Sequence, residues 1–279
     1  MSTPPPDQYG VIGHPVAHSW SPFIHGMFAR QTGESLVYRL HDVLPEDFRA
    51  YVLDFFSRGG RGLNVTVPHK VAAAELANEL TPRAGRAAAV NTLAVQRDNR
   101  VLGDNTDGAG LVHDLRDNLS VNLAGRRVLI VGAGGATRGV MAPLLVLRPA
   151  ELVIANRTAG RAHSLAADFT DLGDVHGCGF DEVGERSYDI VINATSASLA
   201  GEVPAIPPTV IGPDSLCYDM AYSKGDTPFL KWARQHGCTR AFQGWGMLVE
   251  QAAESFQLWR GVRPQTAPVL EALRARATG

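Results

Sequence analysis

The chain has 279 residues, with 26 basic and 28 acidic side chains and a formal net charge of −2. Hydrophobic residues make up 45% and charged residues 19%, a globular balance that excludes a disordered chain and offers no electrostatic support for binding nucleic acid or a membrane surface. The length predicts two modest domains. No apolar run reaches the ~18 residues of a membrane-spanning helix, and the first ten residues lack the basic and apolar regions of a signal peptide.

Cysteine and lysine are both scarce in this sequence. The three cysteines show no Cys-x-x-Cys or Cys/His metal spacing: Cys178, Cys217 and Cys238. They predict free thiols in a reducing compartment, most simply the cytoplasm, and no metal site. Only three of the basic residues are lysines: Lys70, Lys224 and Lys231. Because lysine can lose its proton at an accessible cost and arginine cannot, each lysine is a candidate for proton chemistry.

Strand and helix patterns alternate in the first part of the chain. Ser21 is expected to cap the first helix, since Pro22 suits a first helical turn. Asp98-Asn99 is the expected turn of a hairpin. The expected strands are 9–13, 36–40, 63–67, 90–96 and 100–103, and the expected helices are 21–30, 45–56 and 107–119.

A second strand–helix alternation begins at Arg127. The run Val128 to Val131 is continuously apolar, which is typical of a strand buried on both faces. Glycines at 132–135 and a helix to about Leu147 follow. Further strands are expected over 151–155, 188–194 and 216–220, and further helices over 159–169 and 247–260. The pattern predicts an α/β protein with a parallel sheet and helices on both of its faces.

The strongest local motif is the glycine turn after this buried strand. Gly132 and Gly134 match the first two positions of G-x-G-x-x-G, and Thr137 stands at the third. Backbone N–H groups and a helix N-terminus at such a turn suit a pyrophosphate, so the motif predicts dinucleotide binding.

The next strand distinguishes between the two nicotinamide cofactors. NAD sites usually carry an acidic residue ~20 positions after the first glycine, to bind the ribose 2′-hydroxyl. Here Asn156-Arg157-Thr158 stands 24 positions after Gly132, and Arg161 lies one helical turn further on. Both arginines could be solvated surface residues. Their guanidinium groups suit a 2′-phosphate, so we favour NADP over NAD.

Three polar clusters lie on loops of the first part of the chain. They contain Ser19 and Ser21; Asn64, Thr66 and Lys70; and Asn91-Thr92 with the short polar residues of 103–108, which include Asp107. Each cluster alone could be a turn or a helix cap. Together, beside a separate dinucleotide domain, they predict a small polyhydroxylated substrate.

The motifs of the chain occur in the order seen in shikimate dehydrogenase. They are GHPVAHSWSP, NVTVPHK, AVNT, GDNTDG, GAGGATRG, NRT, INAT, YDMAYSKG and GWGMLVEQAA, and the resemblance runs from about Tyr9 to Trp259. It implies reversible NADPH-dependent reduction of 3-dehydroshikimate to shikimate, on the way to chorismate and the aromatic amino acids. It also implies an α/β substrate domain (1–106 with 244–279), a Rossmann-type NADP domain (107–243), and an active site in the cleft between them.

The resemblance also implies residue roles. Lys70 and Asp107 resemble the catalytic pair. The residues similar to substrate ligands are Ser19, Ser21 and Tyr222 for the carboxylate, and Asn64, Thr66, Asn91 and Gln251 for the ring hydroxyls. The residues similar to the NADP site are Gly132, Ala133, Gly134, Gly135, Ala136, Thr137, Arg138, Asn156, Arg157 and Thr158, joined by Arg161, with Gly244 and Met247 near the nicotinamide.

The chemistry of the catalytic pair agrees with these roles. Hydride delivery to a ketone leaves an alkoxide, so a positioned acid must supply a proton. A Lys70 ammonium can do so, and Asp107 would orient it and oppose its loss of charge. The cofactor carries the hydride step, so we expect no metal.

Several positions depart from the family pattern and leave alternatives open. They are His14, Trp20, His69, Ala197-Ser198 and Gln243. We expect His69 to be a surface histidine at a strand end rather than a catalytic one. The alternatives are a quinate/shikimate dehydrogenase that uses NAD, an aminoshikimate dehydrogenase, and a non-catalytic NADP-dependent regulator. The last would predict loss of Lys70 and Asp107, and both are present. The expected assembly is a monomer or a homodimer.

Overall fold

The computed structural model describes residues 5–278, which form two compact units. Unit 1 comprises the described residues up to Gly110 together with Val249–Leu273, and unit 2 comprises Leu111–Leu248 with the described residues from Arg274. The three unit boundaries therefore fall inside three helices, whereas we expected two boundaries, at 106/107 and 243/244. The absence of a signal peptide was predicted partly from residues 1–4, which lie outside the described residues.

Unit 1 contains a mixed six-stranded sheet in the order β2-β1-β3-β5-β6-β4. Strand β5 is antiparallel to both of its neighbours, so the predicted hairpin is confirmed as β5 and β6. The strands are β1 (Asp7–Gly13), β2 (Leu36–Asp42), β3 (Gly60–Val65), β4 (Glu79–Leu80), β5 (Thr92–Val95) and β6 (Val101–Asp104). The helices include α1 (Ser21–Thr32), α2 (Phe48–Ser57), α3 (Lys70–Leu76) and α4 (Pro82–Ala87).

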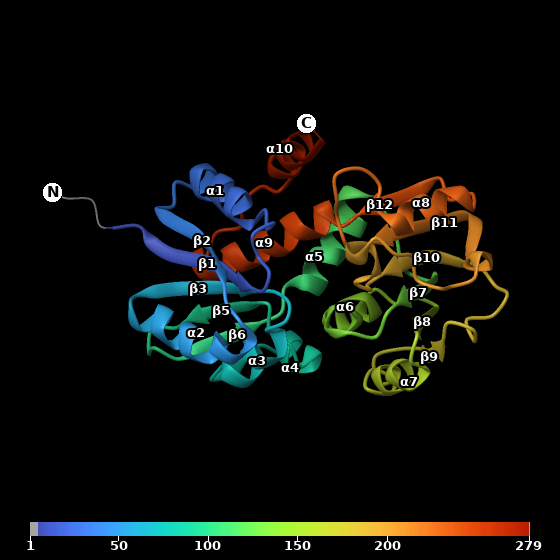
Figure 1. Cartoon of the computed structure of the whole chain (residues 1–279), viewed down its shortest axis with the longest axis horizontal. Helices are drawn as coiled ribbons and strands as arrows, with labels where there is room; N and C mark the ends of the chain where they lie inside the picture. The colour runs from blue at the N-terminus through green and yellow to red at the C-terminus, as the bar shows by residue number, and fades with distance from the viewer. Residues whose placement is uncertain (1–4, 279) are drawn as a thin grey trace. The chain divides into compact units, whose positions relative to one another are not determined.

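Helices cover both faces of the unit 1 sheet (Figure 1). Ile12 and Leu63 point to one face, where they share a core with Phe48 of α2. Tyr9 points to the other face, where its ring lies 4.8 Å from that of Trp259 in helix α9 (Trp245–Arg260). This alternation of neighbouring side chains follows from the two-residue period of a strand. The part of α9 within unit 1 thus belongs to its core.

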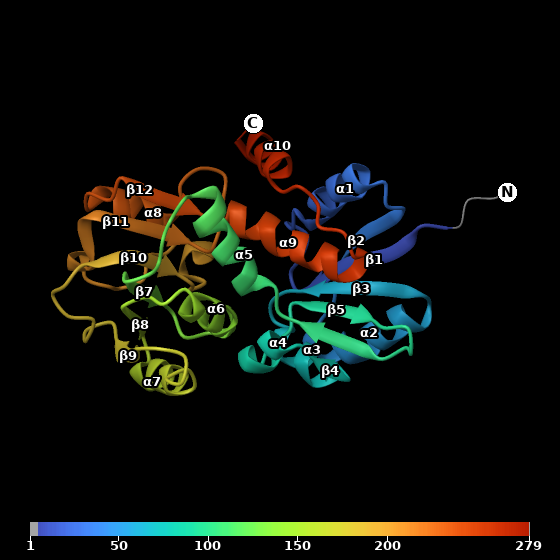
Figure 2. The same cartoon turned by 180° about the vertical axis from the view of Figure 1, so that it is seen from behind.

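Unit 2 contains six parallel strands in the order β12-β11-β10-β7-β8-β9, the doubly wound order typical of dinucleotide-binding domains (Figure 2). The strands are β7 (Arg127–Val131), β8 (Glu151–Asn156), β9 (Val175–Gly179), β10 (Tyr188–Asn193), β11 (Ile211–Asp219) and β12 (Arg240–Gln243). The helices within it are α6 (Gly135–Val146), α7 (Ala159–Ala167) and α8 (Pro228–Gln235). The prediction of a two-domain α/β fold with a parallel sheet is confirmed.

The apolar strands of unit 2 divide their side chains between two cores. Val128 and Ile130 join a core with α6 and α7, while Leu129 and Val131 join a core with α8. This explains the uninterrupted apolar run of β7, because both faces of a parallel sheet are covered by helices. Among residues 5–278 no helix has both the length and the apolar character needed to cross a bilayer.

Some local predictions were wrong. Ser21 is the first residue of α1 and does not cap it; its own backbone N–H is accepted by the Ser19 hydroxyl at 3.3 Å. The helix expected over 107–119 is an α-helix, α5 (Asp107–His113), that continues as a π-helical turn over Asp114–Asn118. Residues 45–47 form a 3₁₀ turn before α2. The elements that we did not predict are α3, α4, α8, β4, β9, β12 and a last helix, α10 (Ala267–Thr278).

Candidate active site

Lys70 and Asp107 form an ion pair in unit 1. Each is the first residue of a helix, α3 and α5 respectively, and their side chains are 20% and 11% exposed. The Lys70 ammonium donates to Oδ2 of Asp107, and Asn91 Nδ2 donates to Oδ1 at 2.8 Å. Because both carboxylate oxygens accept hydrogen bonds, the carboxylate cannot rotate freely and it holds the ammonium in a fixed place.

Asn91 is itself fixed by its neighbours. Its Nδ2 also donates to the Thr106 hydroxyl at 2.9 Å, and its Oδ1 accepts the Thr106 backbone N–H at 2.8 Å and the Thr92 hydroxyl at 2.9 Å. All three side chains are buried. A buried polar group is costly unless it is hydrogen-bonded, so this set of bonds sets the orientation of the amide beside Asp107.

Asn64 lies in the same network on the neighbouring strand β3. Its Nδ2 donates to the Ser255 hydroxyl at 2.8 Å and to the Thr92 hydroxyl at 3.1 Å, and its Oδ1 accepts the Tyr38 hydroxyl at 2.7 Å. Tyr38 comes from β2 and Ser255 from α9, so Asn64 joins three elements of unit 1.

The two serines are bound to each other beside this network. The Ser19 hydroxyl donates to that of Ser21 at 3.1 Å, and the Ser21 side chain lies near the Tyr38 hydroxyl. Gln251 lies close to the limit of a hydrogen bond, with its Oε1 3.5 Å from the Thr106 hydroxyl. The hydroxyl of Thr66 is half-buried and has no hydrogen bond to any other residue within 5–278. Unit 1 therefore brings together the predicted residues Ser19, Ser21, Asn64, Lys70, Asn91, Asp107 and Gln251.

Two members of the network were not found from the sequence. Ser255 lies four residues after Gln251 on α9, and that spacing places both on one side of the helix, a signal that was present. Tyr38 lies in a strand with no polar motif around it. Its ring stacks on that of the fully buried His25, with centroids 4.2 Å apart, and no local pattern pointed to it.

The prediction that His69 is a surface histidine was wrong. His69 is buried, its ring stacks on that of Phe48 at 4.7 Å, and its Nε2 donates to the Val43 carbonyl at 2.8 Å. Burial lowers the pKa of His69, so the ring is neutral at neutral pH. Because His69 immediately precedes α3, these contacts fix the position from which Lys70 extends.

The carboxyl ends of the unit 2 strands meet along one edge of the sheet. The register aligns Val131 with Ala155 and with Asn193, and Asn193 with Asp219, which in turn pairs with Gln243. Ligands of doubly wound sheets bind at this edge. The predicted cofactor residues Gly132, Asn156 and Gly244 all lie at or directly after these strand ends.

The glycine loop after β7 is closed on the protein side and open on the other. Gly132 has φ +108°, a conformation that favours glycine, and Thr137 donates to its carbonyl at 2.7 Å. The Ala133 N–H donates to Asn156 at 3.2 Å. Gly134 and Gly135 are exposed, and a Cβ added to either would meet no atom within 4 Å. With Ala136 they begin α6, so the loop has free space and a helix N-terminus where a pyrophosphate fits.

The arginines of unit 2 fall into two kinds. Arg157 and Arg161 are exposed, and their guanidinium groups have no hydrogen bond or ion pair with any residue within 5–278, so both are free to bind a phosphate. Arg138 instead pairs with Asp168 at 2.6 Å. The Thr158 carbonyl accepts Asn156 Nδ2 at 3.0 Å, which holds the backbone on either side of Arg157.

The segment from β11 to α9 contains the remaining predicted residues. Gly244 has no room for a side chain, since a Cβ would lie 2.4 Å from the Met220 carbonyl oxygen, and Met247 is buried in the first turn of α9. The Tyr222 ring packs 4.5 Å from that of Trp245, and burial raises the pKa of Tyr222 to about 12. Tyr222 belongs to unit 2, whereas Ser19 and Ser21 belong to unit 1.

Two of the departures from the family pattern have clear structural roles in unit 2. Gln243 accepts the Ser223 N–H and donates to the Gly225 carbonyl, both at 2.7 Å, so its neutral amide closes the loop that carries Tyr222. The residue after Ala197 is Ser198, whose hydroxyl donates to the buried Asp219 at 2.6 Å.

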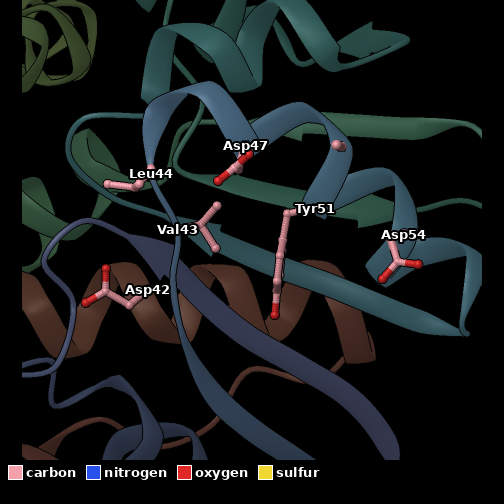
Figure 3. A pocket seen from close by; sticks show the side chains of 7 residues that line it. Asp42, Val43, Leu44, Asp47, Tyr51 and Asp54 are labelled. Carbon is pink, nitrogen blue, oxygen red and sulfur yellow. The ribbon is translucent and has the colours of Figure 1, made fainter.

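A pocket of about 510 Å³ lies elsewhere in unit 1, between the end of β2 and α2 (Figure 3). Its walls contain none of the predicted site residues: Asp42, Val43, Leu44, Asp47, Ala50, Tyr51 and Asp54. Two of its three carboxylates already have partners: Asp42 hydrogen-bonds His14, and Asp54 forms an ion pair with Arg58. The pocket is therefore separate from the network around Lys70.

Comparison with known proteins identifies the family. Family models match three stretches: the shikimate dehydrogenase substrate binding domain over residues 11–93, shikimate / quinate 5-dehydrogenase over 114–200, and the shikimate 5′-dehydrogenase C-terminal domain over 244–274. A protein of Methylococcus capsulatus named shikimate dehydrogenase (NADP(+)) is 55% identical over 270 residues, which are 97% of each chain. The chain belongs to the shikimate dehydrogenase family. The resemblance drawn from its motifs is thereby confirmed.

Solved structures agree with this membership in the shikimate dehydrogenase family. An enzyme of Pseudomonas putida named Ael1 has a TM-score of 0.90 and 44% identity, with 98% of both chains covered. The shikimate 5-dehydrogenase of Thermus thermophilus, solved with NADP(H) and shikimate, has a TM-score of 0.85 and 31% identity, with 96% of this chain and 99% of that chain covered.

Proposed function

We propose that this chain catalyses the reversible NADPH-dependent reduction of 3-dehydroshikimate to shikimate, a step toward chorismate and the aromatic amino acids. The observation that carries the proposal is the Lys70 ammonium held by an Asp107 carboxylate whose second oxygen is bound by Asn91. An ammonium fixed in this way beside several amides and hydroxyls is suited to proton transfer on a polyhydroxylated ring. Membership in the shikimate dehydrogenase family supports the same reaction.

Substrate binding is assigned to unit 1. Asn64, Thr66, Asn91 and Gln251 offer donors and acceptors for ring hydroxyls, and Ser19 with Ser21 offers two hydroxyls for a carboxylate. Tyr222, whose raised pKa keeps its hydroxyl protonated, is the third carboxylate ligand.

Cofactor binding is assigned to unit 2. The stretch from Gly132 to Arg138 would hold the pyrophosphate, with backbone N–H groups at the start of α6 as donors. The stretch from Asn156 to Thr158 would hold the adenosine ribose, with Arg157 and Arg161 on the 2′-phosphate. Gly244 and Met247 would lie beside the nicotinamide.

Proton transfer is the protein's share of the chemistry. When bound, NADPH supplies the hydride that converts the ketone carbon to an alcohol. Lys70 donates a proton to the ketone oxygen as negative charge develops there, and in the reverse direction it removes the hydroxyl proton. Asp107 keeps the ammonium in place, and Asn91 keeps Asp107 in place.

An assay of the purified protein tests this function. Shikimate or quinate is mixed with NADP or NAD, and the absorbance of the reduced cofactor is followed. We expect rapid reduction of NADP with shikimate and much slower reduction of NAD. Equal or faster turnover with quinate and NAD would replace the proposal with a quinate/shikimate dehydrogenase. Binding of NADP without turnover of either substrate would contradict an enzymatic function and favour a regulator.

We also propose a cytoplasmic location and a monomeric or homodimeric assembly. The three cysteines are free thiols, and Cys217 and Cys238 are buried in contact with each other, which suits a reducing compartment. Light scattering on the purified chain measures the assembly, and a stable species larger than a dimer would contradict it.

A further inference from the structure

We infer that Tyr218 and Asp114 are positioning residues that fix the first turn of α9, and with it Met247, in the cofactor site. This inference rests on the proposed function, because Met247 is a proposed cofactor residue. Both side chains lie in unit 2, are almost fully buried, and have no part in the site described above.

The residue directly before α9 offers no capping side chain. The first backbone N–H groups of a helix have no partner within the helix, and a Ser, Thr, Asp or Asn side chain just before it usually accepts one of them. Here Gly244 precedes Trp245, the first residue of the helix, so no such side chain exists. Gly244 cannot be replaced by a capping residue either, because a Cβ would collide with the Met220 carbonyl.

The Tyr218 hydroxyl holds a carboxylate at this helix start. It donates to Oδ2 of Asp114 at 2.6 Å, and that carboxylate lies against Gly246, the second residue of α9. Burial, and next the charge of Asp114, raise the pKa of Tyr218 well above its usual range, so the hydroxyl keeps its proton and remains a donor.

Further features hold Asp114 at the first turn of α9. It begins the π-helical turn, and its Oδ1 accepts Asn118 Nδ2 at 3.0 Å. The carboxylate also lies directly against Gly246, where a Cβ would be 1.7 Å from Oδ1. A glycine at 246 is therefore required for the approach. A carboxylate beside a helix N-terminus is also favoured by the helix dipole.

These contacts place the start of α9 where a cofactor binds. Tyr218 is the penultimate residue of β11, and α9 begins directly after β12, at the edge formed by the carboxyl ends of the strands. Through Asp114, the hydroxyl of Tyr218 thus connects the sheet to the turn that carries Met247. Loss of the hydroxyl would remove the hydrogen bond that holds the Asp114 carboxylate against Gly246 and the first turn of α9.

The test compares Tyr218→Phe with a matched control, Tyr188→Phe. Tyr188 is an equally buried tyrosine of the same sheet, but it belongs to the other core, and its hydroxyl lies 3.4 Å from the Val183 carbonyl. Two kinds of measurement are made on both variants. The first is hydrogen exchange of the segment 244–248 in the protein without cofactor. The second is steady-state kinetics, which give kcat, KM and the deuterium isotope effect with shikimate labelled at the carbon that gives up hydride.

We expect faster exchange at 244–248 only in Tyr218→Phe. We expect its kcat to fall by at least about tenfold, since a displacement of about 1 Å can cost up to ~100-fold, with an unchanged KM for shikimate and a larger isotope effect. Equal exchange, kcat and isotope effect in the two variants would overturn the inference. If Tyr218→Phe does not fold, Asp114→Asn takes its place under the same criteria. If the wild-type protein does not oxidise shikimate, the proposed function fails, and the exchange measurement alone decides the inference.

Discussion

The polar network of unit 1 and the glycine loop of unit 2 are prepared for ligands in opposite ways. Around Lys70 the functional side chains are bound to one another, and both carboxylate oxygens of Asp107 are occupied. In unit 2 Gly134 and Arg157 are exposed, and the Arg157 guanidinium has no partner within the described residues. Unit 1 thus acts through orientations that are fixed before a ligand arrives, whereas unit 2 offers free donors and charge.

After the loss of Lys70 itself, the largest expected effect comes from Asp107→Asn, which tests the fixed orientation in unit 1. An amide cannot accept from Lys70 and Asn91 with both of its ends, so one donor loses its acceptor and the ammonium loses its counter-charge. We expect kcat to fall by about 100-fold, within the range typical of acid–base groups. Steady-state kinetics measure it, with the exposed Asp54→Asn as control. Equal kcat in the two variants would show that the carboxylate is dispensable.

Stability is expected to depend on pH through His25, the buried histidine that stacks on Tyr38 of the same network. Burial lowers the pKa of His25 to about 3, whereas it is near 6.5 in an unfolded chain. Between these values only the unfolded chain binds the proton, so stability is complete above pH ~6.5 and falls as the pH decreases, by up to about 1.4 kcal/mol per pH unit.

Denaturant unfolding of wild type, His25→Phe and His163→Asn between pH 7 and 5 checks this expectation. His163 is exposed and serves as the control, so its variant should keep the wild-type slope. His25→Phe should show a shallower loss of stability than wild type. Parallel curves for all three proteins would rule out His25 as the source of the pH dependence.

A smaller effect is expected in unit 2, where charge replaces fixed orientation. Arg157→Ala or Arg161→Ala should raise the KM for NADPH by about tenfold, since a hydrogen bond to a charged group is worth about 1.5 kcal/mol or more. The KM for shikimate should not change, and activity with NADH should be unaffected. The exposed Arg97→Ala in unit 1 is the control. An unchanged preference for NADPH in both variants would refute the assignment of these arginines.

The smallest effect on stability is expected for Gly134→Ala. Its φ of −99° and the free space around it accept a Cβ, so unfolding should change by less than about 0.5 kcal/mol. Gly132→Ala, with φ +108°, should cost about 1–3 kcal/mol. Thermal or denaturant unfolding separates the two. NADP binding measured by calorimetry should nevertheless weaken in Gly134→Ala; tight binding would place the pyrophosphate elsewhere.

The sequence predicted those elements whose pattern is local. The apolar run of β7 followed by glycines identified the parallel sheet, and Asp98-Asn99 identified the hairpin. Strand β9 was missed because its sequence, Val-His-Gly-Cys-Gly, has little strand propensity and is held by pairing with β8. Helix α8 was missed although Thr227 caps it and Pro228 begins it, so that signal was present.

In the candidate site, too, only the residues that belong to local sequence motifs were predicted. Lys70, Asn91 and Asp107 were predicted because short motifs contain them. Tyr38 could not be predicted, because its role depends on β2 lying beside β1 and on a hydroxyl that reaches Asn64 across the sheet. The burial of His69 depends likewise on Phe48 of α2. Which motif residues contact one another is decided by tertiary packing, and the local sequence does not contain that information.

The central claim is that Lys70 transfers the proton, and Lys70→Ala tests it most directly. The control is Lys231→Ala, an exposed lysine of α8. With shikimate and NADP we predict that kcat of Lys70→Ala falls by a factor of hundreds or more, on the order of what a general acid–base group contributes, while KM stays near the wild-type value and Lys231→Ala behaves as wild type. A kcat of Lys70→Ala close to that of wild type would contradict the account.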